Sequence, residues 1–166
     1  MRLFAVAFST LALAGGTPPS WHTFRAHHVS VRYPATWFAT AQPLTLVTGP
    51  SQAIAIASYP LPTSSAGSNG CQPKAALTRM PSNGAFIFGW DYGALASLGT
   101  SRRDFPPEPV RFRLAGFARY ECMGPSYMVR FRVGGRAFQI HIYFGRKASS
   151  TTRALALRVL DSFRAG

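Results

Sequence analysis

The feature that most constrains this chain is the Gly134-Gly135 pair, which lies between two runs of strand-forming residues at 127–133 and 136–144. Because glycine readily takes the positive φ values of a two-residue β-turn, the pair predicts an antiparallel hairpin with Val133 opposite Arg136. Counting outward from the turn gives one apolar face, formed by Tyr127, Val129, Phe131, Phe138, Ile140 and Ile142. The opposite face carries Ser126, Met128, Arg130, Arg132, Ala137, Gln139, His141 and Tyr143. This two-sided pattern predicts an antiparallel sheet with one face in a core.

A helix is predicted after the hairpin, beginning at Ser149 or Ser150, either of which can serve as its N-cap. Apolar side chains recur there at helical spacing: Leu155, Ala156, Val159, Leu160 and Phe163. We expect this stripe to pack on the apolar face of the hairpin and Leu157, which lies outside the stripe, to be exposed. Further strands are predicted at 23–33, 44–48, 53–59 and 85–90, with a short helix at 74–80. Together these segments predict an α+β fold, an antiparallel β-sheet with flanking helices in a single domain at 22–164.

The N-terminal segment predicts export. Arg2 precedes an apolar run at 3–14, and Ala12 and Ala14 are the small residues that a signal peptidase reads. The run is shorter than the ~20 residues of a membrane span, so we interpret 1–14 as a signal peptide and 15–21 as a flexible lead-in. A buried N-terminal strand or helix is the alternative. The mature chain, with no transmembrane segment, is then expected to be secreted or associated with the cell envelope.

The chain has two cysteines, Cys71 and Cys122. An even count in an exported protein favours a disulfide, and the alternative is two free thiols. There is no Cys-x-x-Cys spacing, which argues against a redox or zinc site.

Charge indicates what kind of partner to expect. The chain carries 18 basic and 5 acidic side chains, a net charge of +13, yet only 14% of its residues are charged and 47% are hydrophobic. This composition predicts a folded protein with a basic surface, and such a surface attracts polyanions. Outside a cell these are anionic cell-wall polymers, lipid surfaces, acidic glycans or an acidic protein. The export signal argues against a nucleic acid.

One group of residues is the candidate ligand-binding site. Arg111 and Arg113 alternate with Phe112 and Leu114, as in a strand, and would extend the polar face of the hairpin. The predicted site is Arg111, Arg113, Arg130, Arg132, Gln139, His141 and Tyr143. Guanidinium groups bind phosphate, sulfate or carboxylate through paired hydrogen bonds, so this face predicts a non-catalytic module for an anionic partner. An ordinary solvated face, or one covered by a helix, is the alternative.

Other chemistries have weaker support. His27 and His28 are adjacent, so in one strand they point to opposite faces, and no metal or cofactor site is predicted. Nucleophile and zinc-protease motifs are absent from the sequence. A hydrolase that uses Asp104 or Glu108 with a histidine remains an alternative, as does a structural or assembly subunit that docks through exposed apolar residues such as Leu157.

The order of several short motifs resembles a known family. They are Val-Ser-Val-Arg-Tyr-Pro at 29–34 with Trp37, Ala-Ile-Ala-Ile-Ala-Ser at 53–58, the two cysteines, Gly-Arg-Ala-Phe at 135–138, and Arg-Val-Leu-Asp-Ser-Phe at 158–163. The chain resembles small secreted proteins of high-GC Gram-positive bacteria whose domain is similar to the PsbP-type α/β/α sandwich. The resemblance implies an antiparallel sheet between helices, and it implies no catalytic residue. Fold likeness alone does not assign a function.

Overall fold

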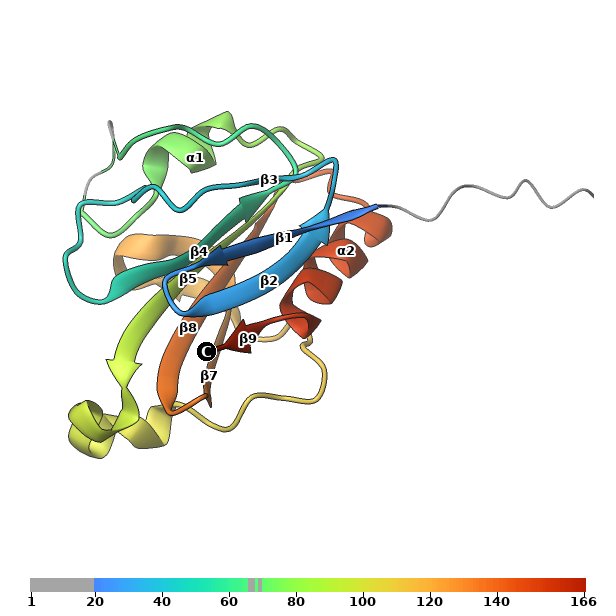
Figure 1. The fold of residues 1–166 in the computed structure, drawn as a ribbon. Helices are drawn as coiled ribbons and strands as arrows, with labels where there is room; N and C mark the ends of the chain where they lie inside the picture. The colour runs from blue at the N-terminus through green and yellow to red at the C-terminus, as the bar shows by residue number, and fades with distance from the viewer. Residues whose placement is uncertain (1–19, 66–67, 69) are drawn as a thin grey trace, which may run out of the picture.

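The computed structural model describes residues 20–65, 68 and 70–166, which form an α+β fold built on two antiparallel sheets (Figure 1). The predicted signal peptide at 1–14, and most of the lead-in at 15–21, lie outside the described residues. Within the described part, no helix is both long enough and apolar enough to cross a membrane.

The larger sheet has six strands in the order β3-β4-β5-β8-β7-β6. Their bounds are Phe38–Ala39 for β3, Ser51–Ala57 for β4, Ala85–Ala94 for β5, Arg136–Phe144 for β8, Gly124–Val133 for β7 and Phe117–Tyr120 for β6. The smaller sheet has the order β1-β2-β9, with bounds Trp21–Ala26, Val29–Pro34 and Arg164–Ala165. The helices are α1 (Lys74–Arg79) and α2 (Ser150–Asp161), with 3₁₀ segments η1 (Leu95–Asp104) and η2 (Glu121–Met123).

The predicted hairpin is confirmed as β7 and β8. Gly134 and Gly135 have φ values of 58° and 72°, and Val133 pairs with Arg136 across the turn. The register continues as predicted, with Phe131 opposite Phe138 and Tyr127 opposite Ile142 at its far end. Phe131 and Phe138 are fully buried, so the apolar face of the hairpin is a core face.

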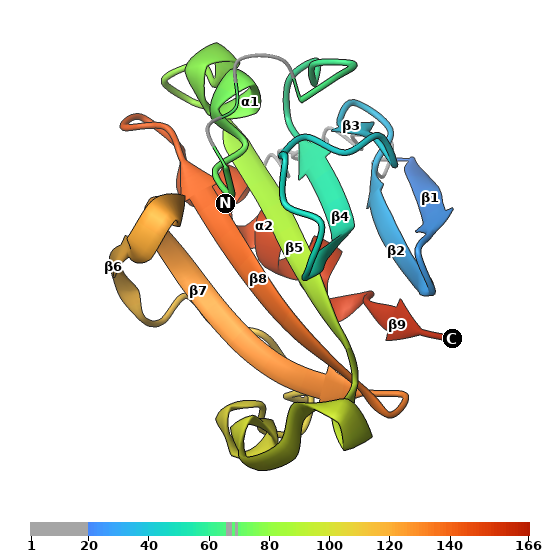
Figure 2. The same cartoon turned by 90° about the vertical axis from the view of Figure 1, so that its left-hand side faces the viewer.

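The core on this face lies between the six-stranded sheet, α2 and the smaller sheet (Figure 2). The Oγ of Ser149 accepts a hydrogen bond of 3.0 Å from the Thr152 backbone N–H, which makes Ser149 the N-cap of α2. The helix buries Ala156, Val159 and Leu160, as its apolar stripe predicts. The prediction that Leu157 is exposed is wrong, because Leu157 is partly buried against the same core.

The other face of the six-stranded sheet has its own core of large aromatic side chains. Phe86, Phe88 and Trp90 project from β5 into it, and the chain that carries α1 covers one end. Cys71 and Cys122 form the predicted disulfide here, with their Cα atoms 6.0 Å apart. The disulfide links the loop before α1 to η2, so it joins two segments that lie over this face.

Two predicted strands differ from the structure. The run at 23–33 is interrupted at His27 and His28, which form the two-residue turn between β1 and β2 with φ values of 51° and 64°. The segment at 44–48 is not a strand. Leu44 is buried there, and its N–H donates to the Gln52 side chain instead of to a neighbouring strand.

Candidate ligand-binding site

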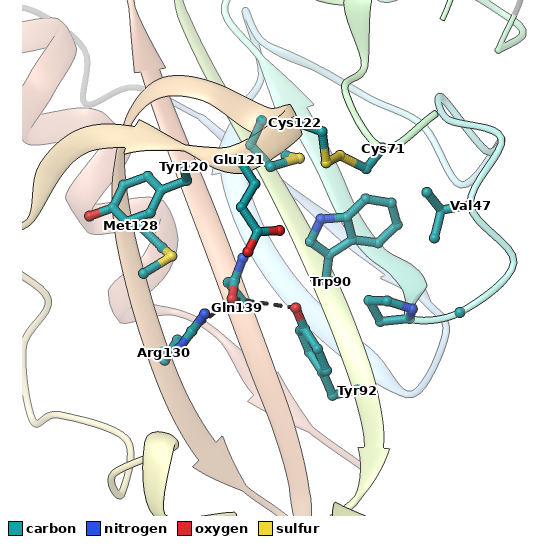
Figure 3. Close-up of a pocket in the computed structure, with 13 residues that line it drawn as sticks. Val47, Cys71, Trp90, Tyr92, Tyr120, Glu121, Cys122, Met128, Arg130 and Gln139 are labelled. Carbon is teal, nitrogen blue, oxygen red and sulfur yellow. Dashed lines mark hydrogen bonds between the residues drawn. A yellow bond between two sulfur atoms is a disulfide. The ribbon is translucent and has the colours of Figure 1, made fainter. Parts of the chain in front are cut away.

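A pocket of about 320 Å³ opens on the aromatic face of the six-stranded sheet (Figure 3). We call it the sheet-face pocket. Its lining comes from three neighbouring strands, from the loop before β4 and from the disulfide-linked segments: Val47, Gly49, Pro50, Cys71, Trp90, Tyr92, Tyr120, Glu121, Cys122, Met123, Met128, Arg130 and Gln139. Its volume lies at the lower end of the roughly 300–1,000 Å³ that is typical of small-ligand sites.

Strand register brings the polar residues of the pocket together. Trp90 on β5 pairs with Gln139 on β8, which in turn pairs with Arg130 on β7. Cross-strand partners project from the same face of a sheet, so these three side chains form one row. Tyr92 lies two residues beyond Trp90 on β5 and also lines the pocket.

A chain of hydrogen bonds runs from the pocket into the protein. Arg130 Nε donates to Gln139 Oε1 at 2.8 Å, and the Tyr92 hydroxyl lies 3.4 Å from the same oxygen. Gln139 Nε2 lies 2.7 Å from His141 Nε2, and His141 Nδ1 lies 2.9 Å from Ser126 Oγ. A guanidinium can only donate, so the amide oxygen faces Arg130 and the amide NH₂ donates to His141. The proton of His141 is therefore on Nδ1 and is donated to Ser126.

This chain holds His141 as a neutral imidazole. His141 and Ser126 are both fully buried. Burial, and to a smaller extent the positive charge of Arg130, lower the pKa of His141 from 6.5 to about 4. Burial also raises the pKa of Tyr143, whose hydroxyl donates to the Met123 carbonyl at 3.1 Å. The network beneath the pocket thus adds fixed dipoles but no buried ionised group.

Ser126 and His141 are the residue types of a nucleophile–base dyad, but the hydrogen bond between them runs in the wrong direction for one. A general base must accept the serine proton, whereas His141 Nδ1 carries a proton and donates it to Ser126. Neither side chain is accessible to a substrate. The pair is therefore a structural link that orients Gln139 and, through it, Arg130.

Among the described residues that line the pocket, Arg130 is the one cation, and its guanidinium is hydrogen-bonded at one nitrogen. Among the described residues the only side-chain ion pair joins Arg136 to Asp91, at 2.6 Å, so Arg130 has no carboxylate partner. Its Nε is held by Gln139, and no protein group in the described part of the chain accepts a hydrogen bond from its terminal nitrogens. Those nitrogens are available for an anionic group in the pocket.

The structure places only some of the predicted site residues at the pocket. Arg130 and Gln139 line the pocket, and His141 and Tyr143 lie beneath it, buried rather than on an open basic surface. Arg132 is turned away, with Nη1 donating to the Phe105 carbonyl at 2.9 Å.

The strand predicted to carry Arg111 and Arg113 beside the hairpin is wrong. They do not lie in a strand of the sheet, and they flank Phe112, whose ring packs 5.1 Å from that of Phe131 on the opposite, apolar face. The backbone N–H of Phe112 donates to the Asp161 carboxylate at 2.8 Å, which ties this segment to α2. Both arginines therefore lie away from the sheet-face pocket.

Sequence reasoning missed the aromatic and acidic walls of the pocket. Trp90 and Tyr92 are two residues apart on β5, a spacing that would have placed them on one face had the strand been extended beyond Trp90. Tyr120 and Glu121 are positioned by the disulfide and by the Glu121 φ of 33°, a conformation that non-glycine residues rarely adopt. Figure 3 shows the Glu121 side chain pointing into the pocket from the disulfide side.

The carboxylates of the hydrolase alternative lie elsewhere. Asp104 is exposed at the end of η1, and Glu108 lies in the following segment, where its N–H donates to the Arg132 carbonyl at 3.0 Å. Neither residue lines the sheet-face pocket, and neither is hydrogen-bonded to a histidine within the described residues. The described ranges also hold no cluster of three or more histidine, cysteine or acidic residues that could bind a metal ion.

Comparison with known proteins gives no family assignment. No family model matches the chain, and no curated protein matches it.

Proposed function

We propose that this protein is a secreted, non-catalytic binding module that holds a carboxylate-bearing glycan segment in the sheet-face pocket. The observation that carries the proposal is the state of Arg130. Its guanidinium is oriented by a 2.8 Å hydrogen bond to Gln139, lacks a carboxylate partner, and lies in a pocket. A planar guanidinium that is held at one edge presents its other N–H groups as a fork for a carboxylate.

The side chains that line the pocket favour a ligand that contains a sugar ring. Trp90, Tyr92 and Tyr120 offer aromatic surface against which the C–H face of a sugar can pack. Gln139 and the Glu121 carboxylate offer hydrogen-bonding groups for hydroxyls. Aromatic side chains beside a few fixed polar groups are a common pattern in small-ligand sites.

The acidic residues of the pocket support binding rather than hydrolysis of the glycan. Glycosidases of the usual type need two carboxyl groups on opposite sides of the scissile bond. Glu121 is the only carboxylate among the described residues that line the pocket, so the pair of carboxyl groups is not present there.

Export and family membership belong to the same proposal. The apolar segment at 3–14 supports a signal peptide, and the Cys71–Cys122 disulfide fits an oxidising compartment. We propose a PsbP-like domain on the strength of the motifs noted above and of an antiparallel sheet with α2 on one face. The short α1, of six residues, covers only part of the other face, and this leaves room for the pocket.

The test is calorimetric titration with a glucuronic-acid tetrasaccharide, and with the same tetrasaccharide after reduction of its carboxyl groups. The native protein is expected to bind the acidic form and to lose at least about tenfold in affinity for the reduced form, because a charge-assisted hydrogen bond contributes roughly 1.5–3 kcal/mol. Arg130→Gln is expected to abolish this preference, while Arg130→Lys restores part of it.

Arg119→Gln is the matched control, because Arg119 is an exposed arginine on β6 that does not line the pocket. This control is expected to bind like the native protein. Equal affinity for the acidic and reduced sugars would overturn the proposal, and so would an Arg130→Gln variant that binds as well as the native protein.

A further inference from the structure

A second cationic surface lies on the outer face of the small sheet, away from the sheet-face pocket. Cross-strand pairing joins Arg25 to Ser30 and Ser30 to Arg164, and the next row joins Thr23 to Arg32. Paired residues project from the same side, and Phe24 and Val31 of the alternate row are buried, so these arginines point outward. We call this surface, completed by Arg158 of α2 and Arg111, the small-sheet arginine face. In the view of Figure 1, none of the other helices and strands that the structure describes crosses in front of β1 and β2.

Shallow hollows lie on this surface. A hollow of about 480 Å³ holds Arg25, His28 and Arg164 beside the β1–β2 turn. Two further hollows, of about 110 Å³ and 460 Å³, share Arg158. The first of these two pairs Arg158 with Arg32, and the second pairs it with Arg111. Each hollow thus has two arginines that come from different elements.

Two of these side chains, those of Arg158 and Arg164, contact neighbours other than carboxylates. The Arg158 guanidinium lies 5.1 Å from the centre of the Trp21 ring, a cation–π contact that leaves its charge unneutralised. Arg32 is fixed through its backbone, whose N–H donates to Ser162 Oγ at 2.8 Å. Arg164 donates to the carbonyls of Phe163 and Asp161 at the end of α2.

Two acidic residues lie near this surface and do not cancel its charge. Asp161 lines one hollow, and its carboxylate already accepts a hydrogen bond from the Phe112 N–H. Burial raises the pKa of Glu108. The positive charge of Arg164 is close enough to oppose this with a smaller, lowering effect on the same pKa. Five arginines therefore face two acidic side chains, and no ion pair within 4 Å joins any of them in the described residues.

We propose that the small-sheet arginine face binds a linear polymer of phosphate groups. Successive outward residues of a strand are about 7 Å apart and neighbouring strands about 5 Å, so the arginines form a two-dimensional array rather than a single site. The oxygens of a phosphate group are arranged tetrahedrally, so they can accept hydrogen bonds from two guanidinium groups that approach from different directions. Each hollow provides two such guanidinium groups. A carboxylate, in contrast, presents its two oxygens in one plane.

The composition of the face favours such a chain over a lipid bilayer. Bilayer binding needs apolar side chains that insert below the headgroups. The outward residues between the arginines are Thr23 and Ser30, and the aromatic residue, Trp21, is partly buried against the guanidinium of Arg158. The proposal concerns residues other than Arg130, so it stands or falls independently of the sheet-face pocket.

The test is the binding of fluorescently labelled long-chain inorganic polyphosphate, followed by anisotropy over a series of salt concentrations. The triple variant Arg25→Gln, Arg32→Gln and Arg158→Gln is expected to lose at least about tenfold in affinity near 0.15 M salt. Its slope of log K against log salt is expected to fall by about 2, since each lost phosphate contact removes about 0.7. Arg130→Gln is expected to bind polyphosphate like the native protein.

The matched control removes the same charge elsewhere, with Arg79→Gln, Arg119→Gln and Arg146→Gln, all exposed residues outside this face. An equal loss in the control triple would show that net charge alone attracts the polymer and would overturn the proposal. So would binding to phosphatidylglycerol vesicles in place of polyphosphate.

The triple variant also removes the Trp21–Arg158 contact, so a second variant tests the charge of the face with every arginine in place. Thr23→Glu adds a negative charge beside Arg32 without removing any arginine. Its control is Ala118→Glu, which adds a negative charge at an exposed position of β6 in the other sheet. Only the Thr23→Glu variant is expected to weaken polyphosphate binding, and unchanged binding in that variant would contradict the proposal.

Discussion

Acidification should destabilise this protein through one residue, His141. Its folded-state pKa of about 4 lies below the 6.5 of an exposed histidine. Below pH 6.5 the unfolded chain therefore takes up a proton that the native protein excludes. The stabilisation is complete above pH 6.5 and is lost as the pH falls from 6.5 to about 4. Its full size is about 3 kcal/mol, at 1.36 kcal/mol for each pKa unit, and about 2 kcal/mol of it should be gone at pH 5.

The assay is urea unfolding, followed by tryptophan fluorescence, at several pH values between 7.5 and 5. The free energy of unfolding is compared for the native protein and for His141→Gln, whose amide can still accept from Gln139 and donate to Ser126. Glu108 contributes a slope of opposite sign, because burial raises its pKa and its protonation in the native state is stabilising at low pH. That contribution is common to both proteins and cancels in the difference.

The variant is expected to be less stable at pH 7.5, and to lose about 2 kcal/mol less than the native protein between pH 7.5 and 5. Identical pH slopes for the two proteins would refute the reasoning. They would mean that the native protein accepts a proton at His141 without the cost that burial and Arg130 impose.

Three further predictions concern stability. Replacing both Cys71 and Cys122 by serine should lower the free energy of unfolding by about 4 kcal/mol, given the 51-residue separation, and a loss below about 1 kcal/mol in non-reducing urea titrations would contradict this. Ser126→Ala should cost about 1–3 kcal/mol, because it leaves the His141 Nδ1–H without an acceptor, whereas Ser51→Ala at an exposed strand position should change little in the same assay. Gly89→Ala should cost about 1–3 kcal/mol, since a Cβ there would lie 2.4 Å from Ile140 Cδ1; adding Ile140→Val should recover part of the loss in thermal melts, and no recovery would refute the clash.

Local pattern was enough to predict the hairpin and the C-terminal helix. The Gly134-Gly135 turn sets the register of β7 and β8, because a two-residue loop leaves only one alignment of the two arms. The helix α2 follows from the spacing of its apolar residues and from the Ser149 cap. These predictions depend on residues close together in the chain, whose periodicity survives any arrangement of the remaining elements.

Other predictions failed where tertiary contacts override local preference. The pair His27-His28 carries no glycine or asparagine to mark a turn, yet the chain reverses there so that β1 and β2 can pack as a hairpin. Arg111 and Arg113 alternate with apolar residues as in a strand, but the burial of Phe112 against Phe131 and the hydrogen bond to Asp161 hold that segment near α2.

The sequence by itself determined which face of the hairpin is apolar, that its register places Arg130 opposite Gln139, and that two cysteines are available to pair. Only the tertiary structure decided that the polar face is largely buried, with His141 sealed beneath Gln139, and that Trp90, Tyr92 and Glu121 close a pocket around Arg130. The physical reason is sequence distance. The pocket residues come from β5, β7, β8, the loop before β4 and the disulfide-linked segments. No periodicity within one segment specifies how separate segments pack on one another.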